Sequence, residues 1–171
     1  MTKAIYAGSF DPFTLGHLDI VNRASKMFDE VFIALGTNTS KKSLFNADEK
    51  VEMIQEVICK YSNNNVKVIQ FTDGLIVDLA KKLDAKVMLR GLRSVVDMEY
   101  EMNIASMNKT QAPEIESVFL MADEKYRFVS SSLIKEIAQF DGDISGMVPE
   151  NIAKRMKEKY TKKVNGSRMM R

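Results

Sequence analysis

The only histidine of the chain, His17, lies where two opposing influences on an imidazole meet. It follows a loop with glycines at positions 8 and 16 and stands at the expected start of a helix, where backbone N–H groups favour an anion. The helix dipole favours the neutral imidazole, whereas a bound phosphate favours its cation. A single histidine is common as a structural residue, but one in this position is suited to donating a hydrogen bond to a phosphate. His17 is therefore the first candidate catalytic residue.

Two arginines follow the fourth strand-like segment, in the tetrapeptide Arg-Gly-Leu-Arg of residues 90–93. A guanidinium group binds phosphate through two parallel hydrogen bonds, and Gly91 permits a sharp turn that directs both side chains inward. The alternative is a pair of surface arginines that form ion pairs with Asp97 and Glu99. The sequence alone leaves both interpretations open.

Two further groups of residues fit an anionic ligand. Lys41 and Lys42 occupy a polar loop after the second strand, where lysines are usually solvated but can also close over a nucleotide as point charges. Serines occupy residues 130–132 at the start of a later helix, and one of them is expected to cap it. Lys135 follows in the first turns, where a cation opposes the helix dipole, so this helix start is predicted to meet an external phosphate.

The composition excludes several other kinds of site. A single cysteine, Cys59, cannot form an internal disulfide, and with one histidine it cannot complete a Cys/His zinc site. No pair of carboxylates has the neighbours expected of an acid–base dyad or a metal site, so no metal ligands are predicted. The chain has neither a Gly-Lys-Ser/Thr phosphate loop nor the Gly-x-Gly-x-x-Gly fingerprint of dinucleotide binding.

Charge and hydropathy limit the expected partners. The net charge is +2, but residues 154–171 carry eight basic side chains against one acidic one, so the rest of the chain is acidic overall. An acidic body argues against nucleic-acid binding, which needs clustered positive charge. No apolar run approaches the roughly 18 residues that cross a bilayer, and no signal peptide precedes the first strand. We expect a cytoplasmic protein that contacts neither nucleic acid nor membrane.

The elements that must position these residues alternate between strand and helix. Strands are predicted at residues 3–7, 31–35, 66–71, 86–89 and 117–121, and helices at about 17–27, 46–61, 75–83, 97–112, 131–140 and 149–160. This alternation favours one Rossmann-like α/β domain over residues 1–160, with a five-stranded parallel sheet in the order 3-2-1-4-5 and helices on both faces. That order brings the loops after the first and fourth strands side by side. Residues 161–171 are expected to form a basic, disordered tail.

Four segments together resemble one family of enzymes. Residues 8–17 read Gly-Ser-Phe-Asp-Pro-Phe-Thr-Leu-Gly-His and contain the Thr-x-Gly-His version of the His-x-Gly-His motif of nucleotidyltransferases. The Arg-Gly-Leu-Arg of residues 90–93, Tyr-Glu-Met-Asn at residues 100–103 and Phe-Val-Ser-Ser-Ser at residues 128–132 narrow the match. In this order, and in a chain of this length, they are similar to the bacterial phosphopantetheine adenylyltransferases, from about residue 3 to residue 151.

The resemblance implies a reaction and a set of residues. Members of the family transfer the adenylyl group of ATP to 4′-phosphopantetheine, which gives dephospho-coenzyme A and pyrophosphate, and they are typically homohexamers that use Mg²⁺. The catalytic residues that the resemblance implies are His17, Lys41 and Arg90. The residues implied to bind the acceptor are Ser9, Lys41, Ile76 and Arg90. Those implied to bind ATP are Ser9, Phe10, His17, Gly91, Leu92, Arg93, Glu101, Tyr126, Arg127, Phe128, Val129, Ser130, Ser131 and Ser132.

The chain departs from the family pattern at a few positions, and other functions stay open. Ser9 stands where threonine is common and Tyr126 where tryptophan is expected, while an extra residue near Asp73 leaves either Leu75 or Ile76 as the pantetheine contact. The nearest alternative is a nucleotidyltransferase that acts on nicotinate mononucleotide or uses CTP. A non-catalytic nucleotide sensor on the same fold and a basic-tailed nucleic-acid binder are the other interpretations.

Overall fold

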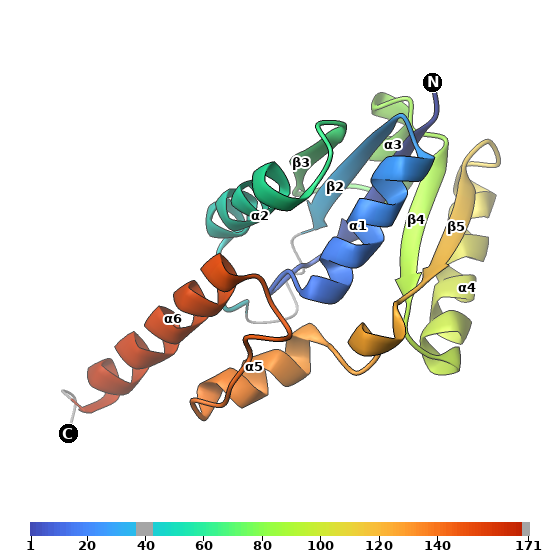
Figure 1. Ribbon diagram of the computed structural model, residues 1–171. Coiled ribbons are helices and arrows are strands. Elements are labelled where there is room, and N and C mark those ends of the chain that lie inside the picture. Colours follow the sequence, from blue (N-terminus) through green and yellow to red (C-terminus); the bar gives the residue numbers. More distant parts are fainter. Residues whose placement is uncertain (37–42, 169–171) are drawn as a thin grey trace.

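The computed structural model describes residues 1–36 and 43–168, the last seven of these as backbone only (Figure 1). Strands and helices alternate along the chain as predicted. Their bounds are β1 (Lys3–Gly8), α1 (Leu15–Met27), β2 (Glu30–Gly36), α2 (Ala47–Tyr61), β3 (Val66–Phe71), α3 (Ile76–Lys82), β4 (Val87–Leu92), α4 (Val95–Gln111), β5 (Glu116–Met121), the 3₁₀ turn η1 (Glu124–Tyr126), α5 (Ser131–Gln139) and α6 (Glu150–Arg168).

The five strands form one parallel sheet in the order β3-β2-β1-β4-β5, which confirms the predicted topology. The central strand β1 pairs with β2 on one side and with β4 on the other. The chain reverses its direction of winding at this point, so the segments after β1 and β4 leave the sheet next to each other. Crevices at such positions are the usual ligand sites of open α/β sheets.

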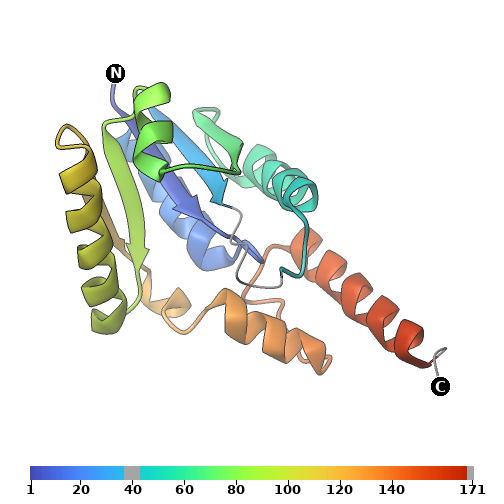
Figure 2. The same ribbon diagram turned by 180° about the vertical axis from the view of Figure 1, so that it is seen from behind.

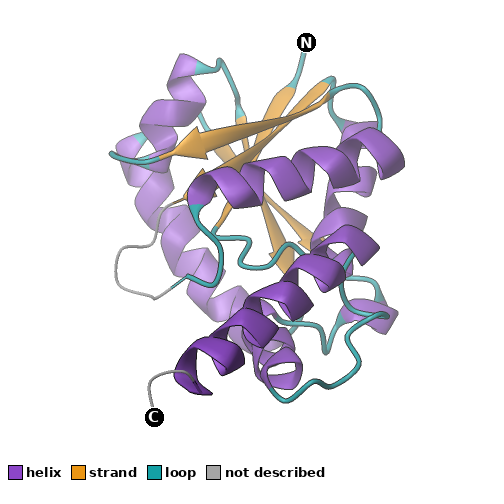
Figure 3. Ribbon diagram, turned by 90° about the vertical axis from the view of Figure 1, so that its left-hand side faces the viewer, coloured by secondary structure: helices purple, strands orange, loops and turns teal. Residues whose placement is uncertain are grey.

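Two apolar clusters cover the two faces of the sheet. The larger one joins inward residues of β1 and β2, such as Tyr6 and Ile33, to α1 and α2 and to residues of α5 and α6. The smaller one joins Ile5, Phe32 and neighbours to α3 and the segment after α4. The sheet therefore lies between two helical layers, with α3 and α4 behind it (Figures 2 and 3). Helices α5 and α6 extend beyond the carboxyl ends of the strands (Figure 1).

Side chains that cap the helices fix where each one begins. Asn46 caps α2 and exchanges hydrogen bonds with Glu49. Ser130 is the serine that caps α5. Helix α4, expected from about residue 97, is capped by Ser94, whose hydroxyl accepts from the backbone N–H of Asp97. A serine hydroxyl is as good an N-cap as a carboxylate, so α4 begins two residues earlier than expected.

Helix α6 is longer than expected. It continues to Arg168, whereas the sequence suggested an end near Tyr160. Lysine is a good helix former, so a lysine-rich extension can propagate a helix that packing has already nucleated. The division of the chain into a domain of residues 1–160 and a disordered tail stays a prediction.

Candidate functional site

A cavity of about 350 Å³ opens at the carboxyl ends of β1 and β4. Its walls come from the end of β1 and the following loop, the first turns of α1, the end of β4, the start of α4 and the segment from η1 into α5. The predicted site residues that line it are Ser9, Phe10, His17, Arg90, Gly91, Arg93, Glu101, Tyr126, Val129, Ser130, Ser131 and Ser132. Segments that are more than a hundred positions apart in the sequence therefore meet at one place.

The first turn of α1 fixes the orientation and the tautomer of His17. Thr14 caps the helix by accepting from the backbone N–H of His17 at 3.2 Å. In return, the backbone N–H of Thr14 donates to the Nδ1 atom of His17 at 3.0 Å. Because Nδ1 is an acceptor in this capping box, the proton of the neutral ring is on Nε2. The imidazole therefore has one N–H donor, on the atom opposite its helix-capping nitrogen.

Aromatic rings surround His17 and keep it neutral. The ring of Phe10 meets the imidazole edge to face at a centroid distance of 5.1 Å, and Phe13 and Tyr6 lie at 5.5 and 6.3 Å. Burial, and next the positive charge of Arg93, lower the pKa of His17 to about 4. At neutral pH the side chain is thus an uncharged hydrogen-bond donor.

Arg90 is held by a carboxylate of α4. Its Nε and one terminal nitrogen donate to the two oxygens of Glu101 at 2.6 and 2.5 Å. Its other terminal nitrogen donates to the carbonyl oxygen of Ala7 in β1 at 2.7 Å. The sequence-based alternative named Asp97 and Glu99 as ion-pair partners of the two arginines. Arg90 pairs with Glu101 instead of Glu99, whereas Arg93 does pair with Asp97. Three of the five guanidinium N–H groups are occupied by these described residues, and the rest remain for a ligand.

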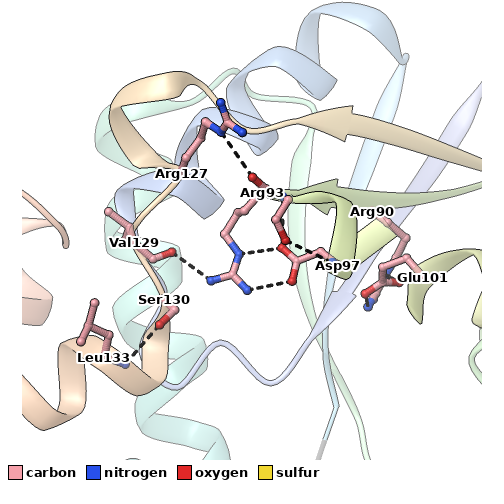
Figure 4. Close-up of polar contacts among 9 residues, drawn as sticks. Arg90, Arg93, Asp97, Glu101, Arg127, Val129, Ser130 and Leu133 are labelled. Carbon is pink, nitrogen blue, oxygen red and sulfur yellow. Dashed lines mark hydrogen bonds and ion pairs between the residues drawn. The ribbon is translucent and has the colours of Figure 1, made fainter. Parts of the chain in front are cut away.

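Arg93 is held in the same way by Asp97, which lies one turn before Glu101 in α4. Its Nε and a terminal nitrogen donate to the two oxygens of Asp97 at 3.1 and 3.3 Å, and the other terminal nitrogen donates to the carbonyl of Val129 at 3.3 Å. The backbone carbonyl of Arg93 in turn accepts from Arg127 at 3.4 Å. Figure 4 shows Arg93 extending between α4 and the segment that leads into α5. Arg93 therefore joins two walls of the cavity.

The start of α5 supplies backbone N–H groups to the same cavity. Ser130 accepts from the backbone N–H of Leu133 at 3.2 Å and lines the cavity with Ser131 and Ser132. An anion in the cavity would therefore meet the N-terminus of α5. Lys135 has a different partner from the one expected: its Nζ lies 3.1 Å from the carboxylate of Asp11, within the protein.

Some predicted site residues do not line the cavity. Leu92 is buried in the protein, and Phe128 is exposed. Arg127 is exposed, and its Nε donates to the backbone carbonyl of Arg93. Ile76 begins α3 and packs against the apolar cluster on the opposite face, with Leu75 exposed next to it. Lys41 lies outside the described residues. The binding roles assigned to these residues stay predictions.

Comparisons with known proteins decide the family. Residues 5–137 match the cytidylyltransferase-like family. A phosphopantetheine adenylyltransferase of Dictyoglomus turgidum is 48% identical over 160 residues, which cover 94% of this chain and 98% of that protein. Another, of Heliobacterium modesticaldum, is 47% identical over 171 residues, which is the full length of both chains. The chain belongs to the phosphopantetheine adenylyltransferase family.

Two solved structures with the same fold carry the names of other nucleotidyltransferases. A putative nicotinate-nucleotide adenylyltransferase of Vibrio parahaemolyticus superposes with a TM-score of 0.68 over 91% of each chain, at 16% sequence identity. A nicotinic acid mononucleotide adenylyltransferase of Plasmodium falciparum superposes with a TM-score of 0.67 over 94% of this chain and 95% of the other, at 14% identity. At these identities the likeness shows the fold alone.

In this member of the phosphopantetheine adenylyltransferase family, Asp97 belongs to the cavity wall, whereas the sequence suggested only a surface ion pair for it. It lines the cavity and accepts two side-chain hydrogen bonds and one backbone hydrogen bond from Arg93. One signal could have found it: Asp97 and Glu101 are four residues apart, so on a helix both lie on one face. The two arginines that they hold are three residues apart, at the end of the neighbouring strand and just beyond it.

The described part of the chain offers no enclosed metal site. No group of three or more histidine, cysteine, aspartate or glutamate side chains among these residues is arranged to hold a metal ion. The two carboxylates in the cavity, Asp97 and Glu101, are already paired with arginines. Among the described helices, none is both long and apolar enough to cross a membrane.

Proposed function

We propose that this chain transfers the adenylyl group of ATP to 4′-phosphopantetheine, giving dephospho-coenzyme A and pyrophosphate. The observation that carries the proposal is the convergence of His17, Arg90, Arg93 and the N-terminus of α5 on one cavity at the carboxyl edge of the sheet. The choice of acceptor is supported by relatives named phosphopantetheine adenylyltransferase that are nearly half identical along the whole chain.

The reaction needs no general base. The acceptor is a phosphate monoester and is mostly a dianion near neutral pH. One of its oxygens attacks the α-phosphorus of ATP, and a new P–O bond forms while the bond between the α-phosphorus and the bridging oxygen to the β-phosphate breaks. Pyrophosphate leaves with that electron pair. Because two anions must meet in line, positioning and neutralisation of charge supply most of the rate enhancement.

His17 is suited to stabilise charge on the α-phosphate. Its ring is neutral at physiological pH, and its remaining donor, Nε2–H, is free of the capping box. A donor that is already oriented in a partly dry site stabilises developing negative charge at no cost of reorganisation. We infer that Nε2–H donates to a non-bridging α-phosphate oxygen as the new bond forms.

The arginines are suited to bind the phosphate groups. Glu101 and Asp97 orient the two guanidinium groups, and each arginine keeps N–H donors that no described residue takes up. We assign Arg90 to the phosphate of the acceptor and Arg93, with the N-terminus of α5, to ATP. The assignment of Lys41 to the acceptor stays a prediction from the family resemblance.

We propose that Mg²⁺ binds to the protein together with ATP. The donor set of the described residues does not fit an Mg²⁺ site made by the chain alone. Mg²⁺ usually keeps several waters and relies on substrate phosphates, so we expect it to arrive bound to the triphosphate. Chelation of Mg²⁺ is expected to stop turnover while leaving the melting temperature of the free protein unchanged. A lower melting temperature after chelation would instead indicate a structural ion.

Self-association is proposed on the basis of α4. Within one chain, no residue of this helix is buried. Large apolar side chains on it are exposed, namely Val95, Val96, Met98, Tyr100, Met102 and Met107. So many exposed apolar side chains on one helix are typical of an interface. The homohexamer that the family resemblance implies is consistent with it, and sedimentation of the purified protein as a monomer alone would contradict it. A cytoplasmic location stays a prediction.

The decisive experiment is pyrophosphate release from ATP and Mg²⁺, with and without 4′-phosphopantetheine, in the unsubstituted protein and two variants. His17→Ala removes both the ring and the capping-box acceptor. His17→Gln removes the imidazole, but glutamine at this helix position can keep the capping box. Loss of one oriented donor typically lowers turnover by about 10²–10³, and we expect this in both variants while ATP still binds.

The controls separate the outcomes. Release that requires the acceptor and falls in both variants supports the proposed reaction and the role of His17. Turnover that is normal in both variants would remove His17 from the mechanism, whereas normal turnover in His17→Gln alone would show that the glutamine amide can replace the imidazole. No release by the unsubstituted protein, with ATP still bound, would favour another acceptor, such as nicotinate mononucleotide, or a nucleotide sensor.

A further inference from the structure

A second group of charged side chains lies behind the loop between β1 and α1, outside the cavity. It consists of Asp11 in this loop, Lys50 in α2 and Lys135 in α5, and none of them lines the cavity. Asp11 and Lys50 are each only 4% exposed. Burying an ionised group is costly unless it is paired and hydrogen-bonded, so this group needs a physical explanation.

Asp11 connects three parts of the structure. One oxygen accepts from the backbone N–H of Leu44 at 2.9 Å and from Nζ of Lys135 at 3.1 Å. The other oxygen accepts from the backbone N–H of Phe45 at 3.0 Å. The carboxylate therefore fastens the loop to α5 and to the residues that lead into α2, so it is satisfied without Lys50.

Lys50 is directed at the loop itself. Its Nζ donates to the backbone carbonyl of Ser9 at 3.2 Å. Burial, the largest influence, lowers the pKa of Lys50, and the nearby Asp11 carboxylate opposes this by favouring the ammonium form. The buried ammonium group therefore donates to the backbone carbonyl of Ser9, a residue that lines the cavity.

Hydrogen bonds hold the loop between β1 and α1 on both sides of Phe10, whose backbone conformation is strained. Lys50 holds the Ser9 carbonyl, and the hydroxyl of Ser131 donates to the carbonyl of Pro12 at 2.8 Å. Between these points Phe10 has a φ of 44°, in the left-handed region that a side chain disfavours. The ring of Phe10 is the one that meets the imidazole of His17 edge to face. The conformation of the loop therefore decides how His17 is supported.

We propose that Lys50 is a positioning residue of the adenylyl transfer, acting through the Ser9 carbonyl. By holding this carbonyl it keeps Phe10 against His17. Lys50 and Lys135 carry two positive charges against the one negative charge of Asp11. A net positive charge therefore lies behind Ser9, on the side of the cavity that must accept phosphates. This inference rests on the proposed function and adds a residue that touches neither substrate.

The test compares four proteins in the pyrophosphate assay: the unsubstituted chain, Lys50→Met, Lys50→Arg and Lys60→Met. Methionine keeps the length and apolar character of the lysine side chain without its charge or donors, while arginine keeps both. Lys60 is an exposed lysine of the same helix and serves as the matched control. The kcat, the KM for each substrate and the melting temperature are measured for each protein.

We expect kcat of Lys50→Met to fall by about tenfold to a hundredfold, because small misplacements of reacting groups have effects of this size. The KM values should change less than kcat, Lys50→Arg should recover most of the loss, and Lys60→Met should match the unsubstituted chain. Equal kcat in Lys50→Met and Lys60→Met would overturn the proposal. So would a folded Lys50→Arg that is as slow as Lys50→Met, because the role would then be packing alone.

Two further outcomes are an unfolded Lys50→Met variant and an unsubstituted chain without activity. If Lys50→Met is unfolded at the assay temperature, Lys50→Gln carries the test, because it keeps a polar side chain but loses the charge and the hydrogen bond to the Ser9 carbonyl. The proposal then requires a lower kcat than that of Lys60→Met, and equality would overturn it. An unsubstituted chain that releases no pyrophosphate would contradict the proposed function, which is distinct from failure of the variants to differ.

Discussion

The two arginine–carboxylate pairs of the cavity wall share one pattern but differ in how firmly they are held. In the inner pair, Arg90 and Glu101, the two hydrogen bonds measure 2.5 and 2.6 Å, and the side chains are 25% and 12% exposed. In the outer pair, Arg93 and Asp97, they measure 3.1 and 3.3 Å, and the side chains are 40% and 28% exposed.

The third hydrogen bond of each arginine explains the difference. In the inner pair, Arg90 donates to the carbonyl of Ala7 in the central strand β1, so this pair is attached to the sheet. The outer pair reaches the carbonyl of Val129 across the cavity and so connects two segments that follow different strands. We infer that the inner pair is a rigid platform that contributes to stability, whereas the outer pair mainly determines the shape of the cavity.

The largest effect on stability is expected from breaking the inner pair. Glu101→Gln keeps the shape of the side chain but leaves the half-buried Arg90 without a carboxylate. Hydrogen bonds between charged groups contribute about 1.5–3 kcal/mol, so the free energy of unfolding should fall by about 2 kcal/mol. Urea denaturation followed by circular dichroism measures this. An unchanged midpoint would show that the inner pair does not support the fold.

A smaller loss of stability, with a clear loss of activity, is expected from the outer pair. In Asp97→Asn the free energy of unfolding should fall by less than about 1 kcal/mol, because exposed ion pairs are screened by solvent. The catalytic efficiency with ATP should still fall by about tenfold, since Arg93 would no longer be oriented. A stability loss equal to that of Glu101→Gln would erase the distinction between the two pairs.

The smallest effect concerns the proton of His17. Because it is the only histidine, its NMR titration is unambiguous, and we expect a midpoint at a pKa of about 4. In Asp97→Asn the charge of Arg93 is no longer balanced, so the pKa should fall further. In Glu101→Gln it should stay the same, because Arg90 is not among the groups that shift it. Equal shifts in both variants would contradict this assignment.

The lowered pKa also has a defined effect on stability. An unfolded chain has a histidine with an ordinary pKa near 6.5, so below this pH it takes up a proton before the folded chain does. The folded state is therefore favoured fully above pH 6.5 and loses this contribution as the pH falls toward 4. His17→Gln should remove that part of the pH dependence.

Much of the fold could be predicted because it depends on local patterns. Alternating strands and helices allow few arrangements, and right-handed crossovers between parallel strands reduce them further. The observed sheet order is a common one among the arrangements that these rules allow, and it brings the segments after β1 and β4 together. The start of α4 could not be predicted as well, because Ser94 and Asp97 are equally good caps and only packing chooses between them.

The rotation of α4 about its axis decides the partner of Arg90. Residues 97 and 101 share one face of the helix, whereas Glu99 lies about 200° around the axis from Asp97 and faces away. The sequence offered Glu99 as a surface partner because proximity along the chain does not reveal the rotation of a helix. Asp11 and Lys50 were missed as a group for a similar reason: they are 39 positions apart, and only the folded chain brings them near each other.

The capping box of α1 ties the chemistry of the cavity to the first turn of a helix. The nitrogen of His17 that bonds Thr14 decides both where the helix begins and which nitrogen carries the proton. No separate residue is needed to select the tautomer, since the backbone does so as soon as the helix forms. A chain in which this turn frays loses a structural boundary and a correctly protonated side chain in the same event. Formation of the first turn of α1 and placement of the His17 proton on Nε2 are therefore a single step.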